Sequence, residues 1–300
     1  MRADFEKICR MSQKKLKTYV TNTLKETHEE VITCDGFVYA QGKFPVLLVA
    51  HMDTVHDKLP NKIIYKKGKI SSPNGIGGDD RCGIYMILEI IKRYHCSVLF
   101  CEDEEMGCVG AEKFVSTDLA EALIGQFNYI IEFDRKGSND AVFYECANDK
   151  FEEFITNEFY KTAFGSFSDI STVAPFLKCA AVNLSCGYYK AHTKDEYVVF
   201  SEMETSMDEA MKILARTTDE KFEYIPSRYG YGYEFRHSGF GDWYDDYNIT
   251  GNYYIICYLN DKGDEDFYET QASSDVEAIG MFCLDNKYAC TADIIDVYCE

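Results

Sequence analysis

The sequence lacks the features that mark membrane-spanning, secreted and disordered chains. No apolar run reaches 18 residues, and the segment Met1–Glu6 has none of the apolar character of a signal sequence. Only 5 of the 300 residues are proline, whereas 46% are apolar and 15% aromatic, so the chain has the material for a sizeable core. We therefore expect a folded cytoplasmic protein of one large domain or two, which does not bind membranes.

Paired cysteine motifs are missing as well. The 13 cysteines are scattered and odd in number, and no Cys-x-x-Cys pair or zinc-finger spacing occurs. Several of them, such as Cys96, Cys101, Cys179 and Cys257, lie inside apolar, strand-like runs. This pattern indicates buried thiols in a reducing compartment rather than disulfides.

Positive charge is scarce, and the shortage is uneven along the chain. The formal net charge is −20, and residues 219–300 contain 18 acidic against 5 basic residues, a balance of −13 that leaves −7 for the first 218 residues. A chain of this charge repels phosphate groups, so we expect no nucleic-acid partner.

Apolar periodicity predicts alternating helices and strands. The run Val46–Ala50, just after Pro45, is typical of a strand buried on both faces. Helical spacing of apolar residues predicts helices over 4–27 and 109–123, and Ser201–Glu204 has the pattern of a capping box that opens a further helix. Other elements are expected at 31–41 and 97–101 (strands), 62–71 (hairpin), after Asp80 (helix), 128–133 and 141–147 (strands), after Asn148 (helix) and 180–184 (strand).

This alternation indicates an α/β fold, with a mixed, mostly parallel twisted sheet flanked by helices. Residues 1–217 would form this α/β domain. Residues 218–250 are rich in Tyr, Gly and Asp and have little periodicity, which predicts a linker or loop region. Residues 251–300 are expected to form a small acidic α+β domain, with strands at 253–259, 266–270 and 294–298 and a helix at 274–285.

Polar residues able to bind metal follow several of the predicted strands. Two histidines and three or more carboxylates at strand ends form a nitrogen and oxygen ligand set that suits a pair of zinc ions or similar divalent metals. A cation would also relieve the mutual repulsion of carboxylates in one confined site. These residues are His51 and Asp53, Asp79 and Asp80, Glu104 and Glu105, Asp134, and His192.

Each stretch has a simpler interpretation by itself. Gly75–Gly78 could cradle a phosphate, but no Gly-Lys-Ser/Thr follows it and the next two residues are aspartates. Gly78-Asp79-Asp80 is similar to nucleotidyl-transfer motifs on hairpins, although a helix follows it directly. Glu102–Glu105 could be a solvated acidic turn, and Asp134 a turn residue. The appearance of all of them in this order favours the metal site.

The motif order resembles the co-catalytic di-zinc exopeptidases, among them tripeptidase T, glutamate carboxypeptidase and the acylases. Over residues 40–217, the segments that carry the resemblance are His51-Met52-Asp53-Thr54-Val55, Gly78-Asp79-Asp80-Arg81-Cys82-Gly83, Glu104-Glu105-Met106-Gly107, Asp134 and Asn183–His192 with Glu196-Tyr197-Val198. The stretch Ser166–Asp169 resembles the aspartate-bearing loop that precedes the final histidine in tripeptidase T.

The resemblance implies a role for each site residue. Glu104 matches the general base that takes a proton from water and passes it to the leaving amine. Asp53 matches the carboxylate that orients His51. The implied metal ligands are His51, Asp79 and Asp134 for one ion and Asp79, Glu105 and His192 for the other. The remaining candidates, His56, His95 and Asp80, are interpreted as structural or outside the ligand set, while Asp169 is open between loop structure and substrate contact.

The chain also departs from the family. Relatives insert a lid and dimerisation domain of more than a hundred residues between the positions matching Asp134 and His192, but here only 58 positions separate the two. Arg81 stands where relatives usually carry lysine. The usual dimer therefore has no visible basis, and a monomer is allowed. Residues 219–300 match no family, and we leave open whether they wall the cleft or form an accessory domain.

The resemblance implies a cytoplasmic, metal-dependent hydrolase with two divalent ions, zinc being favoured. It would most resemble an aminopeptidase, which removes the N-terminal residue of a short peptide. An N-acyl amidase or deacylase is the alternative within enzymes, and a non-catalytic acidic protein that binds a basic partner is the alternative outside them.

Overall fold

The structure is a computed structural model that describes residues 2–144, 146–156, 159–165, 167–225, 252–259, 265–272, 278–279, 282 and 294–299. The chain divides into two compact units, Met1–Pro226 and Ser227–Glu300. Within the described ranges, no helix has the length and apolar character needed to cross a membrane.

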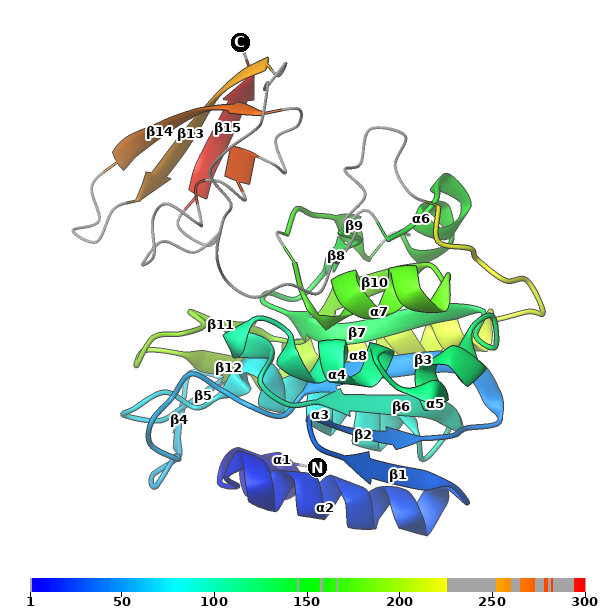
Figure 1. Cartoon of the computed structure of the whole chain (residues 1–300). Coiled ribbons are helices and arrows are strands. Elements are labelled where there is room, and N and C mark those ends of the chain that lie inside the picture. The colour runs from blue at the N-terminus through cyan, green and yellow to red at the C-terminus, as the bar shows by residue number, and fades with distance from the viewer. Residues whose placement is uncertain are drawn as a thin grey trace. The chain divides into compact units, whose positions relative to one another are not determined.

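The first unit is built on an eight-stranded sheet with the order β1-β2-β6-β3-β7-β10-β8-β9 (Figure 1). The central strands β6, β3, β7 and β10 pair in parallel, while β1, β2 and β8 join by antiparallel pairs. The predicted mixed, mostly parallel sheet is therefore confirmed. The strands are β1 (Val31–Cys34), β2 (Phe37–Ala40), β3 (Phe44–His51), β6 (Cys96–Cys101), β7 (Tyr129–Arg135), β8 (Asp140–Val142), β9 (Lys161–Thr162) and β10 (Ala181–Ser185).

Helices cover both faces of this sheet because its central strands are apolar on both sides. In β3, Val46, Leu48 and Ala50 join one core cluster, and Leu47 and Val49 join the other. The first cluster includes α1 (Arg2–Cys9), α2 (Gln13–Thr27), α3 (Gly78–Ile90), α6 (Asp149–Ile155) and α8 (Phe200–Ala215), and the second includes α4 (Val109–Val115), α5 (Asp118–Leu123) and α7 (Asp169–Leu177). Figure 1 shows α4, α5 and α7 in front of the sheet and α3 behind it.

A second, four-stranded sheet has the order β11-β12-β5-β4. The predicted hairpin forms β4 (Ile64–Lys66) and β5 (Lys69–Ser71), which turn at Gly68, whose φ is 78°. Its partners are β11 (Tyr188–Tyr189) and β12 (Tyr197–Val199). This sheet matters for the site because the loop between β11 and β12 carries His192.

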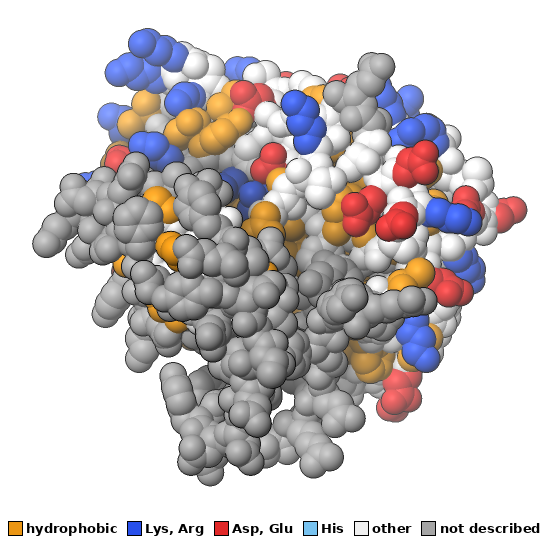
Figure 2. All heavy atoms as spheres, turned by 90° about the horizontal axis from the view of Figure 1, so that it is seen from above, with side chains coloured by type: hydrophobic (Ala, Val, Ile, Leu, Met, Phe, Trp, Pro, Cys, Tyr) orange, Lys and Arg blue, Asp and Glu red, His pale blue; other side chains and the backbone are white. Residues whose placement is uncertain are grey.

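Positive charge is concentrated around the β4–β5 hairpin. Lysines 58, 62, 66, 67 and 69 are all exposed, and no acidic residue occurs between 58 and 78. Figure 2 shows blue side chains gathered with orange ones at its upper left, the side on which β4 and β5 lie in Figure 1. The hairpin is thus a basic stretch on a chain of net negative charge.

Local capping explains where the predicted helices differ from the observed ones. The helix expected over 4–27 is two helices, and the Ser12 side chain accepts from Lys15 N at the start of the second. The helix expected over 109–123 is likewise broken, with Thr117 capping α5. The capping box predicted at Ser201–Glu204 is wrong, because α8 already begins at Phe200 without a side-chain cap. A capping box occurs instead at α7, between Ser168 and Ser171.

The second unit contains an antiparallel sheet with the order β14-β13-β15. Its strands, β13 (Asn252–Leu259), β14 (Glu265–Ala272) and β15 (Ile294–Cys299), match the predicted ones to within one or two residues. The helix predicted over 274–285 lies outside the described residues except at 278–279 and 282. The predicted linker lies outside them from residue 226 onward, and the division into three parts stays a prediction.

Candidate metal centre

The candidate site lies where the parallel strands end. His51 is the last residue of β3, and Asp134 is the second-last residue of β7. Glu104 and Glu105 begin the short 3-10 helix η1 (Glu104–Met106), which follows β6. Asp79 lies at the start of α3. Because the carboxyl ends of parallel strands meet at one edge of a sheet, side chains far apart in the sequence come together here.

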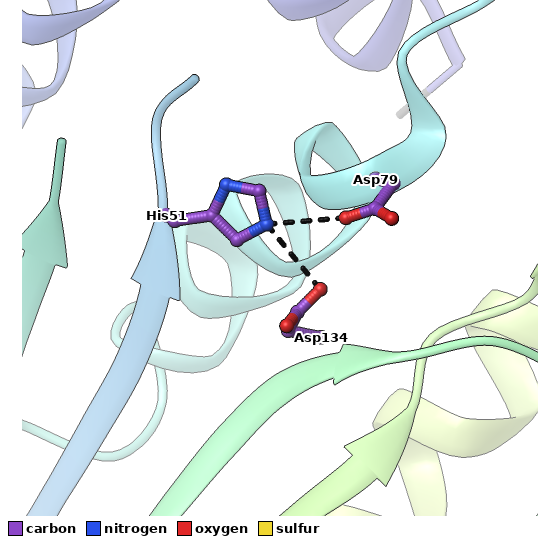
Figure 3. Close-up of side chains that lie close together, drawn as sticks. All are labelled: His51, Asp79 and Asp134. Carbon is purple, nitrogen blue, oxygen red and sulfur yellow. Dashed lines mark hydrogen bonds and ion pairs between the residues drawn. The ribbon is translucent and has the colours of Figure 1, made fainter. Parts of the chain in front are cut away.

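His51 is the centre of one ligand group. Its Nε2 atom lies 3.1 Å from Asp79 Oδ1 and 3.4 Å from Asp134 Oδ1 (Figure 3). The ring is fully buried. A single point between these three side chains is therefore within reach of one nitrogen and two carboxylate oxygens.

His192 is the centre of a second group. Its Nε2 atom lies 3.2 Å from Asp79 Oδ2 and 3.0 Å from Glu105 Oε1. Asp79 thus presents one oxygen to each histidine, which is the arrangement expected of a bridging ligand. Among the described residues, three sets of ligand atoms lie close enough to hold an ion: His51 with Asp79 and Asp134, Asp79 with Glu105 and His192, and His51 with Glu104 and Glu105.

Asp53 fixes two parts of the site at once. Its Oδ1 atom accepts from His51 Nδ1 at 3.1 Å and from the Glu104 backbone N–H at 3.1 Å. Its Oδ2 atom accepts from the Glu105 backbone N–H at 3.1 Å. The carboxylate therefore sets both the orientation of the imidazole and the position of the turn that carries the two glutamates.

Asp134 is held by residues that lie in the motif segments but have no predicted role of their own. Ser168 Oγ donates to its Oδ2 at 3.0 Å, and Tyr188 Oη donates to its Oδ1 at 3.3 Å. Asn183 accepts from the Asp134 backbone N–H at 2.8 Å and donates to its carbonyl at 3.1 Å. The strand end is thus fixed on both sides.

Burial and the crowding of carboxylates raise the pKa values of several groups in the site. Burial, followed by the charge of Asp79, raises the pKa of Asp134 to about 7. Burial also raises the pKa of Glu104 well above its usual value. Burial by itself would lower the pKa of His51. The nearby carboxylates, Asp134 first among them, have the larger opposite effect and raise this pKa. The protein therefore holds protons in this site that a cation would displace.

The residues fit a divalent cation. The donor set of imidazole nitrogens and carboxylate oxygens suits zinc. Glu105 Oε1 is buried and has no hydrogen-bond partner, although His192 Nε2 lies only 3.0 Å away. The two atoms approach each other without hydrogen-bond geometry, as two ligands do when they face a common third point.

Other candidates have a structural place. Asp80 is buried, where it accepts from the backbone N–H groups of His51 at 3.3 Å and Gly83 at 2.8 Å. Asp169 is fully buried at the start of α7, which favours its interpretation as part of the loop structure. His56 bonds Glu196, and Arg81, fully buried, donates to the carbonyl of Met52.

Known proteins share the fold. Residues 38–180 match the model of peptidase family M28. The PepT aminopeptidase of Bacillus cereus is 14% identical with a TM-score of 0.58, over 71% of this chain and 96% of that one. A tripeptidase of Staphylococcus aureus is 12% identical with a TM-score of 0.55, over 71% and 97%. No curated protein sequence matches significantly.

An archaeal structure extends the same likeness. An aminopeptidase of Desulfurococcus kamchatkensis is 14% identical with a TM-score of 0.53, over 71% of this chain and 94% of that one. At such identities the structural likeness shows the fold alone. The similarity to the peptidase family rests on residues 38–180, a little less than half of the chain. Residues 38–180 of this chain are thus similar to peptidase family M28, and the predicted resemblance to the co-catalytic metallopeptidases is confirmed.

Proposed function

We propose that this protein is a cytoplasmic di-metal aminopeptidase that cleaves short peptides. The observation that carries the proposal is the position of Asp79, whose two oxygens lie 3.1 Å from His51 Nε2 and 3.2 Å from His192 Nε2. A carboxylate shared in this way is what two neighbouring ions require. The peptidase family of residues 38–180 supports the reaction class.

In this proposal His51, Asp79 and Asp134 hold one ion, and Asp79, Glu105 and His192 hold the other. When bound, two divalent ions, with zinc favoured, would supply polarisation of the amide carbonyl and activation of a water molecule. The protein itself supplies the position of these ligands and the exclusion of bulk water, since all but His192 are largely buried.

Glu104 is the proposed proton carrier. It is 9% exposed and precedes a ligand, so its carboxylate can reach the water and then the leaving amine. Its backbone N–H is held by Asp53 at 3.1 Å, which fixes the start of the turn. Burial raises the pKa of this carboxyl group, which makes its carboxylate a stronger base than an exposed one.

The environment of the cysteines supports the proposed compartment. Eight cysteines whose side chains the structure describes are free thiols, and only Cys34 among these eight is exposed: Cys9, Cys34, Cys82, Cys96, Cys101, Cys108, Cys179 and Cys186. Such thiols persist in a reducing environment. We propose that the protein acts without a nucleic-acid partner, and a monomer suffices for the site because every proposed ligand comes from one chain.

The test combines metal analysis with hydrolysis of a panel of short peptides with free and blocked N-termini. We expect two zinc equivalents per chain at neutral pH and cleavage that requires a free N-terminus. Glu104→Gln should keep both ions and lose about 10²–10⁴-fold in kcat, because only the proton transfer is removed. Cleavage of blocked substrates alone would favour the N-acyl amidase. A wild-type protein that binds zinc but cleaves nothing would favour the acidic interaction protein, and one that binds no zinc would reject the proposal.

A further inference from the structure

A fully buried carboxylate outside the proposed ligand set holds the loop that leads to Asp79. The side chain of Glu196 has no exposed surface. Its Oε1 atom accepts from the Asp79 backbone N–H at 3.0 Å, and its Oε2 atom accepts from the Gly77 backbone N–H at 2.7 Å. One side chain thus binds two amides of a loop that is 117 to 119 positions away in the sequence.

The loop needs these acceptors because α3 begins irregularly. Asp79 and Asp80 have non-helical backbone angles (φ −82°, ψ 106° and φ −114°, ψ 49°), and the N-cap residue Gly77 lies in the left-handed region at φ 68° without a side-chain cap. The first N–H groups of a helix have no partner within it and require one from elsewhere. Glu196 provides the capping oxygens that the local sequence does not.

Glu196 also lies at the end of the loop that carries His192. Its backbone N–H donates to the Thr193 carbonyl at 3.1 Å and closes that turn. The loop before Asp79 packs tightly against the strands that flank the His192 loop, since a Cβ atom on Gly78 would lie 2.7 Å from Val198 Cγ2 in β12 and 2.8 Å from Tyr188 Cβ in β11. The residue therefore connects the backbone of Asp79 with the backbone of the His192 loop.

His56 completes the arrangement from the other side. Its Nε2 atom donates to Glu196 Oε2 at 2.7 Å, and only 12% of its side chain is exposed. The ring lies against Gly75, where a Cβ atom would come within 2.1 Å of ring carbon Cε1. Glycine at this position leaves the room that the imidazole occupies. The carboxylate is therefore satisfied by three donors and fixed in direction.

We propose that Glu196, held by His56, is a positioning residue that sets the distance between Asp79 and His192. The inference rests on the proposed function, because these two residues are the ligands that the second ion would share with Glu105. Loss of the Glu196 carboxylate frees the Asp79 backbone, so the ligand pair loses its fixed separation although every ligand side chain remains.

The test uses Glu196→Gln and two readouts on the full chain. A glutamine keeps one acceptor but turns an N–H group toward one of the two amides, so we expect faster hydrogen exchange at Gly77 or Asp79 in the metal-free protein. The affinity for zinc, measured by competition with a chromophoric chelator, should fall about 10–100-fold. His56→Ala should also speed hydrogen exchange and weaken zinc binding, but by less than Glu196→Gln does. It replaces Glu196→Gln in the test if that variant does not fold.

Glu202→Gln is the matched control. Glu202 accepts from Tyr189 Oη beside the same hairpin but does not bind the Asp79 loop, so its loss should leave exchange and zinc affinity unchanged. Wild-type affinity and exchange in Glu196→Gln would overturn the positioning role. Absence of zinc binding by the wild-type protein would instead overturn the proposed function.

Discussion

The imidazole Nδ1 of His51 lies 3.1 Å from Oδ1 of Asp53, and the same oxygen accepts the backbone N–H of Glu104. Because a carboxylate oxygen accepts the hydrogen on Nδ1, the opposite nitrogen is left to face Asp79 and Asp134. One aspartate therefore determines which nitrogen of the ring is available to a metal, and it ties that choice to the position of the proposed proton carrier.

Replacing Asp53 by Ala should weaken both functions of this carboxylate. The His51 ring loses its orienting acceptor, and the backbone N–H groups of Glu104 and Glu105 lose theirs. We expect a loss of about 10–100-fold in zinc affinity and a lower kcat at saturating zinc. Calorimetric zinc titration and peptide hydrolysis at several zinc concentrations measure the two effects. Full recovery of kcat at high zinc would contradict the role in holding Glu104.

His28 lies outside the candidate metal centre, and it should make the free energy of unfolding depend on pH. Burial lowers the pKa of His28, the stacked ring of His95 lowers it further, and the Cys96 carbonyl opposes both. The folded-state pKa is thus below the unfolded value of about 6.5, so the stabilisation is complete above pH 6.5 and is lost as the pH falls through the folded pKa. The difference in unfolding free energy between wild type and His28→Gln should shrink from pH 7 to pH 5, as measured by urea titration. A difference that stays constant or grows would contradict this.

Part of the site could be predicted because its residues follow patterns visible in one sequence. His51 ends an apolar run, and Glu104 and Asp134 follow two more, so their meeting at one edge of a parallel sheet was expected. Glu196 follows no apolar strand, and its partners are backbone N–H groups 117 and 119 positions away. Every residue except proline has a backbone N–H group, so the sequence does not indicate which of these groups a distant carboxylate will bind.

The helix α7 was missed although its signal is present. Ile170, Val173, Ala174 and Leu177 have the spacing of a buried helical face and are all buried. Proline usually ends or kinks a helix, yet α7 contains Pro175 and continues to Leu177. Ser166 itself lies outside the described residues. Conversely, Ser201–Glu204 has the letters of a capping box inside a helix, because the motif is short enough to occur without its structure.

Gly83→Ala should destabilise the first unit although alanine is the better helix former. A Cβ atom at Gly83 would lie 2.0 Å from the Phe133 carbonyl oxygen and 2.5 Å from Asp80 Oδ2. The gain in helix propensity is about 1 kcal/mol. Moving α3 away from β7 costs about 1–3 kcal/mol or more and should exceed it. Urea unfolding measures the outcome, with the exposed Asp208→Ala in α8 as the control that should stay within about 0.5 kcal/mol of wild type. A Gly83→Ala protein as stable as wild type would show that α3 can shift freely.

The position at which the chain is shortened should decide whether the first unit stays stable. This unit extends to Pro226, beyond the division predicted at residue 217. Phe222 is 7% exposed and packs against Phe151 and Phe154, with ring centroids 5.2 and 5.1 Å away. Its backbone also bonds Asn128 and Ala180 at 2.8 Å. We therefore expect a chain of residues 1–226 to unfold cooperatively, and a chain of residues 1–217 to be less stable by about 3–5 kcal/mol.

Thermal and urea unfolding of the two shortened chains measure this difference. Phe222→Ala in the 1–226 chain is the matched control, because it removes the ring and keeps the backbone bonds. If ring packing dominates, Phe222→Ala should lose most of the stability that the 1–217 chain loses. If the backbone bonds to Asn128 and Ala180 dominate, this variant should lose little of it. Equal stability of the 1–217 and 1–226 chains would place the boundary where the sequence predicted it and would make residues 218–225 dispensable. If only the 1–217 chain is destabilised, residues 218–225 belong to the core that packs against β7 and α6.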